Sequence, residues 1–217
     1  MELSSLLATP INPEGVLGVA IGLGLAAAAG FRVFVPLLAA GVAAKSGLLP
    51  LAPGFTWLAT TPALAALATA TLLEIGAYAI PWLDQLLDVM ATPAAMLAGM
   101  LATASVVVDL PPWLTWTAVV LAGGAAGLTQ GATVLTRLKS TTLTGGAANP
   151  VVAVFELVGA VVTSLFALFL PLLTLLGVLL GVALVARKMH RVVFGRRGAM
   201  AAPGMDAAGP PRVPRGP

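Results

Sequence analysis

Long apolar stretches, separated by short segments that contain prolines or charges, dominate the pattern along this chain. Their residues do not alternate between apolar and polar as in a half-buried strand. The stretches approach or exceed the ~18 residues typical of a membrane-spanning helix. The pattern therefore predicts an all-α membrane protein with about six transmembrane helices, at about 15–44, 62–80, 93–108, 113–136, 151–170 and 171–186.

One alternative stays open at the last two helices. Residues 150–186 are just enough for two short spans with a tight hairpin at Pro171, and a single helix kinked at Pro171 would leave five spans. Cations concentrate in cytoplasmic segments. Six spans place the C-terminal cations and the segment with Arg137 and Lys139 in the cytoplasm, together with the N-terminus, so the sequence favours six.

Composition excludes a soluble protein. Of the 217 residues, 59% are hydrophobic and 9% charged, whereas a soluble domain carries roughly 25% charged residues. Cysteine is absent and His190 is the one histidine, so we expect no disulfide, no metal and no cofactor. The pI near 10.0 comes mostly from the C-terminal segment, which has no aromatic stacking platform. It indicates membrane orientation and no nucleic acid partner.

Three segments are expected outside the core of the transmembrane domain of residues 15–190, which divides into halves of 15–108 and 113–190. Residues 1–14 form a short N-terminal segment with two prolines. The stretch PWLDQLLDVM has leucines on one face and Asp84 and Asp88 on the other, which predicts a short interfacial helix. Residues 191–217 are basic and then rich in Pro, Gly and Ala, and we expect a disordered cytoplasmic tail.

The segment RLKSTTLTGGAANP, residues 137–150, is the most polar part of the body of the chain. A glycine-rich loop beside two cations and before a helix could hold an anion. The P-loop pattern is not met, so the sequence favours a flexible cytoplasmic connector. The residues of the candidate anion loop are Arg137, Lys139, Gly145 and Gly146.

Glycines recur at four-residue spacing in three of the predicted helices. This spacing lets neighbouring helices approach closely, so we expect these positions to serve helix packing, and they are also compatible with a homo-oligomer. The glycines are Gly18, Gly22, Gly123, Gly127, Gly131, Gly177 and Gly181.

Arg32, Glu74 and Glu156 lie inside apolar stretches, where a charge costs a few kcal/mol. We expect the two carboxylates to bind a cation, a proton or a small solute, with Arg32 as counter-charge. The alternative is that one glutamate pairs with Arg32 to hold helices together. Pro36, four residues after Arg32, predicts either a broken helix that lines a cavity or an arginine that reaches the interface.

The two halves of the transmembrane domain share a pattern. LGLAAAAGFRVFVPLL in the first corresponds to LAGGAAGLTQGATVLT in the second, and LLEIGAYA corresponds to VFELVGAVV, each with a lone glutamate. Three spans per half would give the halves opposite orientations. The pattern predicts a 3+3 inverted repeat, an arrangement common in secondary transporters.

Three blocks together resemble an uncharacterised bacterial membrane family, domain of unknown function 4126. They are GFRVFVPLLAAGVAAKSGLL, LEIGAYAIPWLDQLLD and TGGAANPVVAVFELV. The family tends to carry an Asp-Lys pair where this chain has Tyr78 and Ala79, and a second acid where it has Leu157. The resemblance implies a multi-pass protein of a bacterial inner membrane. It does not assign a particular activity to the chain.

These features favour a secondary transporter or exchanger of a small ion or solute in the cell membrane. The alternative is a non-transporting structural or accessory protein that packs through its small-residue faces. We do not expect an enzyme, because no span carries paired aspartates, a serine with a base or a histidine cluster.

Overall fold

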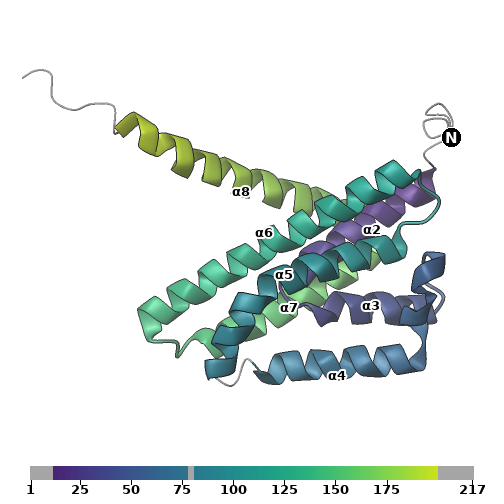
Figure 1. Ribbon diagram of the computed structural model, residues 1–217, viewed down its shortest axis with the longest axis horizontal. Coiled ribbons are helices and arrows are strands. Elements are labelled where there is room, and N and C mark those ends of the chain that lie inside the picture. Colours follow the sequence, from purple (N-terminus) through teal and green to yellow (C-terminus); the bar gives the residue numbers. More distant parts are fainter. Residues whose placement is uncertain (1–11, 78–80, 200–217) are drawn as a thin grey trace, which may run out of the picture. The chain divides into compact units, whose positions relative to one another are not determined.

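The computed structural model of this chain describes residues 12–77 and 81–199. Every regular element in these ranges is a helix, which confirms the all-α prediction (Figure 1). The elements in chain order are α2 (Pro13–Ala29), α3 (Phe34–Lys45), the 3-10 helix η1 (Pro53–Ala59), α4 (Thr61–Ala77), α5 (Pro81–Val106), α6 (Pro112–Thr144), α7 (Asn149–Phe169) and α8 (Pro171–Ala199).

The described helices have the length and apolar character of a membrane protein. By themselves α6 and α7 can cross a bilayer, and η1 with α4 is a third candidate in which the two helices are bent by 67°. Shorter apolar helices are α2, α3, Met90–Val106 and Pro171–Val185. The predicted count of six spans and the inverted repeat stay predictions.

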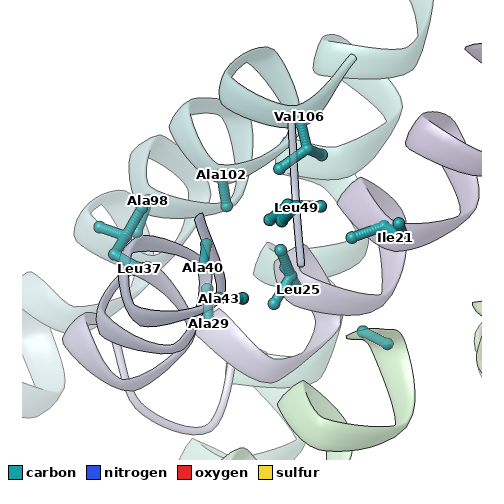
Figure 2. Close-up of a cluster of buried hydrophobic side chains, with 11 residues drawn as sticks. Ile21, Leu25, Ala29, Leu37, Ala40, Ala43, Leu49, Ala98, Ala102 and Val106 are labelled. Atoms are coloured by element: carbon teal, nitrogen blue, oxygen red, sulfur yellow. The ribbon is translucent and has the colours of Figure 1, made fainter. Parts of the chain in front are cut away.

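The helix α2 is the centre of the described bundle, with α5, α6, α7 and α3 packed around it (Figure 1). Its small residues permit this. A Cβ on Gly22 would lie 2.8 Å from Thr103 Cγ2 on α5, and one on Gly18 would lie 2.7 Å from the carbonyl oxygen of Val106. The larger apolar side chains, such as Leu25, fill the space between α2, α3 and α5 (Figure 2).

The first apolar stretch is a broken helix that folds back on itself. After α2 ends, residues 30–33 reverse the chain and α3 begins at Phe34. Beyond the end of α3, the N–H of Ala52 donates to the carbonyl of Ser105 at 2.8 Å, close to where α5 meets the first half of α2. Since α3 starts at the end of α2 and returns to the level of its beginning, the two helices are antiparallel.

The break therefore decides between the two interpretations of Pro36. Arg32 lies in the turn itself and is 2% exposed among the described residues. Its side chain is therefore buried in the bundle and does not extend to the membrane interface. Pro36 lies in the first turn of α3, where the missing N–H of proline costs no helical hydrogen bond.

Three predicted boundaries differ from the structure. The interfacial helix at PWLDQLLDVM is not separate, because α5 runs through Pro93 without interruption. The polar segment 137–150 is not mainly a loop, since α6 continues to Thr144. In the tail, residues 191–199 belong to the helix α8, while 1–11 and 200–217 and the side chains of Asp84 and Asp88 lie outside the description.

The chain divides into two units, Met1–Leu180 and Gly181–Pro217. The first holds the bundle from α2 to α7 and the beginning of α8. The second contributes the remainder of α8, including Gly181. A Cβ added to Gly181 would meet no described atom within 4 Å. The charge network and the pocket described below belong to the first unit.

Candidate functional site

A buried ion pair joins α6 to α7. The Nε of Arg137 donates to Glu156 Oε1 at 2.8 Å, and its Nη2 donates to Oε2, so the guanidinium binds the carboxylate through two parallel bonds. The two residues are 3% and 6% exposed. Such fork-to-fork geometry is stronger than a single charged contact.

The turn between the two helices brings this pair together. Gly145 and Gly146 both adopt positive φ, at 63° and 90°, a conformation that side chains with a Cβ strongly disfavour. They reverse the chain sharply, so α7 runs back along the last turns of α6. Arg137 and Glu156 are 19 residues apart in sequence but lie on facing sides of this hairpin.

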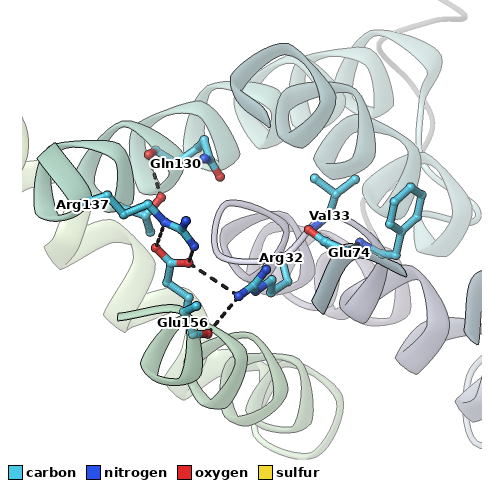
Figure 3. A network of polar contacts seen from close by, with 9 residues as sticks. Arg32, Val33, Glu74, Gln130, Arg137 and Glu156 are labelled. Atoms are coloured by element: carbon cyan, nitrogen blue, oxygen red, sulfur yellow. Dashed lines mark hydrogen bonds and ion pairs between the residues drawn. The ribbon is translucent and has the colours of Figure 1, made fainter. Parts of the chain in front are cut away.

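Arg32 reaches the same carboxylate from the turn between α2 and α3. Its Nη2 donates to the carbonyl of Ala153 at 2.9 Å and lies 3.8 Å from Glu156 Oε2. Figure 3 shows the two guanidinium groups directed at Glu156 from different elements. The carboxylate thus ties the α2–α3 turn to both α6 and α7.

Glu74 binds the other side of that turn. Its Oε1 accepts from the N–H of Val33 at 2.9 Å and its Oε2 accepts from the N–H of Phe34 at 3.3 Å (Figure 3). These amides belong to the first turn of α3, which no side chain of its own caps. The free N–H groups and the positive end of the helix dipole favour an anion there. Glu74 supplies that anion from α4.

Among the described side chains, the charges of this network balance. Arg32 and Arg137 contribute two positive charges, and Glu74 and Glu156 two negative ones, all on side chains that are less than 9% exposed. Balance matters because an unpaired charge in a low-dielectric interior is costly. Both glutamates converge on residues 32–34, from α4 and from α7, and neither lies on an outer face of the bundle.

A pocket of about 210 Å³ adjoins Glu156. It lies between α6 and α7, with one side chain from the α2–α3 turn. Its lining residues are Phe31, Ala132, Thr133, Thr136, Val152, Phe155 and Glu156. The buried network therefore has an opening at its Glu156 side.

Arg137 corrects the anion-loop hypothesis. The sequence placed it in a polar loop with Lys139, Gly145 and Gly146, but its side chain points into the bundle and binds Glu156. Lys139 is exposed, and the glycines form the turn. One signal was overlooked: Gln130, Thr133 and Arg137 recur every three to four residues and are all buried, which continues the inward face of α6.

The glycine positions divide into two groups. Gly18, Gly22, Gly123 and Gly127 each lie against α5, the last two beside the side chains of Met100 and Met96. For Gly131, Gly177 and Gly181, no described atom lies within 4 Å of where a Cβ would stand. The described residues contain no group of three or more His, Cys, Asp or Glu side chains that could hold a metal.

Comparison with known families gives one result. The model of the family described as "Domain of unknown function (DUF4126)" matches residues 19–191. The matched range includes α3 to α7, most of α2 and all four residues of the network. The comparisons with curated proteins and with solved structures each found no match.

Proposed function

This chain belongs to the DUF4126 family, and from the geometry of its charge network we propose that it is a secondary transporter or exchanger of a small ion or solute. The observation that carries the proposal is the broken helix α2–α3, whose turn is buried in the bundle and held by two glutamates from different helices.

Broken helices have a physical rationale at membrane depth. Non-helical backbone is tolerated there only where it is buried in protein or lines a cavity. In secondary transporters such breaks form the substrate or ion site, because they expose backbone groups and helix ends near the middle of the bilayer. The turn at residues 30–33 places the start of α3 beside Glu74, Arg32 and Glu156 in this way.

The two glutamates would have different roles. Glu156 is held by Arg137 and by Arg32, which suits a fixed support. Glu74 instead accepts hydrogen bonds from the neutral backbone N–H groups of Val33 and Phe34, so it is the better candidate for the group that gains or loses a proton or a cation. When Glu74 is neutralised, its hold on the start of α3 weakens and the α2–α3 hairpin can move.

We further propose a topology in which α2 and α3 form a re-entrant hairpin. The start of α2 lies beside Leu110, just before α6, whereas the exposed Lys139 lies near the other end of α6. If that cation is cytoplasmic, the hairpin enters from the outside. This arrangement replaces the first of the six predicted spans, leaves five crossings, and places the N-terminus outside a cell membrane.

The proposal is tested by flux measurements in proteoliposomes. The variants are Glu74→Gln and Glu156→Gln, with Glu14→Gln as the matched control, since Glu14 is exposed and undergoes the same chemical change. Uptake of protons and of the common mono- and divalent cations is followed for each variant. A pH gradient of either sign serves as the driving force.

We expect flux above that of protein-free vesicles for the native chain and for Glu14→Gln. Glu74→Gln should abolish it or remove its dependence on the pH gradient, while the variant still incorporates and remains helical. Equal flux in the native chain and in Glu74→Gln would contradict the proposal, as would a native chain that carries none of the ions tested.

The second candidate is a non-transporting structural or accessory membrane protein. The observation in its favour is that Glu156 is fixed by two arginines, as in a purely structural ion network. Gly131 and Gly177, beside which an added Cβ would meet no described atom within 4 Å, would then be contacts for another helix or a second copy. Absence of flux together with a stable oligomer in detergent would favour this candidate. Neither candidate is an enzyme.

A further inference from the structure

The pocket beside Glu156 has a definite hydrogen-bonding character. Thr133 Oγ1 donates its proton to the carbonyl of Gln130 at 2.8 Å, and Thr136 Oγ1 donates to the carbonyl of Ala132 at 2.9 Å. The Glu156 carboxylate has no proton to give while it binds arginine. The polar side chains of the lining therefore present acceptors to anything that enters, and the hydroxyl protons are already used.

The rest of the lining is apolar. Phe31 and Phe155 contribute aromatic rings, and Ala132 and Val152 add aliphatic surface. The volume of about 210 Å³ corresponds to about seven water molecules at ~30 Å³ each. This space suits a small organic molecule with an apolar body and one polar end, the usual combination in ligand pockets.

The surroundings of the pocket indicate the route by which a ligand arrives. Phe155 in the lining is 73% exposed, and both α6 and α7 carry further exposed apolar side chains. Leu135 is 60% exposed and Val154 is 60% exposed. In a bilayer these apolar side chains meet lipid, because they do not interact favourably with water. A molecule that enters here comes from the hydrocarbon region and is uncharged.

We propose that this pocket binds a neutral, lipid-soluble alcohol or phenol, whose O–H donates to Glu156 or to a threonine oxygen and whose apolar body lies between Phe31 and Phe155. An anion finds no donor among the lining side chains. A cation would approach a carboxylate that two arginines already neutralise. The site exists whether or not the protein transports ions, so this inference goes beyond the proposed function.

Because the chain contains no cysteine, single cysteine variants give an unambiguous test. Thr136→Cys places a thiol in the pocket lining, and Val152→Cys does so from the opposite helix. Leu138→Cys is the matched control, because Leu138 is 58% exposed on α6 and does not line the pocket. The full chain is reconstituted in lipid nanodiscs, and the rate of alkylation by N-ethylmaleimide is measured by mass spectrometry.

The probes share one ring and differ in their polar group: benzyl alcohol, toluene, benzylammonium and benzoate. At ten times its dissociation constant, benzyl alcohol should slow alkylation of Thr136→Cys or Val152→Cys about tenfold, from the factor 1 + [L]/Kd. Toluene and the two ions should slow it much less, and Leu138→Cys should react equally with every probe.

Equal protection by toluene would show that the hydroxyl group is not recognised, and would overturn the proposal. Stronger protection by benzylammonium or benzoate would overturn it in favour of an ion site. Slowing of Leu138→Cys to the same extent would reveal a general effect on the bilayer and count against the site. Since alkylation does not depend on flux, a protein that transports nothing can still satisfy this test.

Discussion

Removing the carboxylate of Glu156 should destabilise the protein more than removing either charge around it. Glu156→Gln deletes the anion shared by Arg32 and Arg137 and leaves two guanidinium groups facing each other. Among the described side chains of the native chain, the four buried charges sum to zero, since two are positive and two negative. The variant leaves a net charge of +1 in a space that is almost closed to water.

The magnitude follows from the geometry. At the 3.8 Å between Arg32 Nη2 and Glu156 Oε2, Coulomb's law with an effective dielectric constant of ~20 gives about 4 kcal/mol. The bidentate pair with Arg137 is closer still. Desolvation offsets part of this in the intact network, but breaking a buried pair typically costs about 3–5 kcal/mol, because the remaining charge is uncompensated. We expect a loss in this range for Glu156→Gln.

The companion variants make the charge argument specific. Arg137→Met should cost less than Glu156→Gln, since Glu156 still has Arg32 as a partner. The double variant Arg137→Met/Glu156→Gln restores a net charge of zero and should be more stable than Glu156→Gln alone. The coupling energy between the two sites should therefore be about 1–3 kcal/mol. Glu14→Gln, at an exposed site, should stay within about 0.5 kcal/mol of the native chain.

The assay is equilibrium unfolding in mixed micelles, in which the SDS fraction is raised and helix content is followed by far-ultraviolet circular dichroism. The order of stability should be native, then Arg137→Met, with Glu156→Gln lowest and the double variant above it. Additive effects of the two substitutions, or a Glu156→Gln variant as stable as the native chain, would refute the view that the network is charge-balanced and buried.

Three further outcomes follow from the structure. Glu74→Gln should raise the rate of amide hydrogen exchange in the first turn of α3 without affecting α7, because two charge-assisted hydrogen bonds become at most one neutral bond. Unchanged exchange rates would exclude the capping role of Glu74. Gly22→Ala should lower the free energy of unfolding by about 1–3 kcal/mol in the same SDS titration, since its Cβ would lie 2.8 Å from Thr103 Cγ2. Gly131→Ala should leave that free energy nearly unchanged. Gly145→Ala should lower the free energy of unfolding by about 1 kcal/mol, because Gly145 has a φ of 63°. A stabilised variant would contradict the assigned turn.

Several features of the structure can be predicted from local sequence signals. The apolar stretches predicted most of the helices, because each forms its own backbone hydrogen bonds and needs no partner to satisfy them in lipid. Pro171 marked the start of α8, and Glu74, Glu156 and Arg32 were identified as costly charges inside apolar segments. Three short blocks of the sequence also indicate the family.

The ends of helices were harder to predict. Polar residues such as Ser140 and Thr144 suggested a loop, yet α6 continues through them, since threonine hydroxyls can donate to carbonyls within the same helix. The prediction of a loop also groups Arg137 with Lys139 as a loop cation, although Arg137 lies in α6 and is buried. Only the extension of the buried face of α6 beyond Thr133 assigns it to the interior.

By itself, the sequence determined that this protein is helical, apolar enough for a bilayer, and obliged to place three charges in costly surroundings. Those properties depend on composition and on neighbours a few residues away. Only the tertiary structure decided how the charges are satisfied: Glu74 at the start of α3, and Glu156 between Arg32 and Arg137. Arg32 and its hydrogen-bond partner Ala153 are 121 residues apart in sequence. Electrostatic attraction depends on distance in space, which the order of residues does not contain.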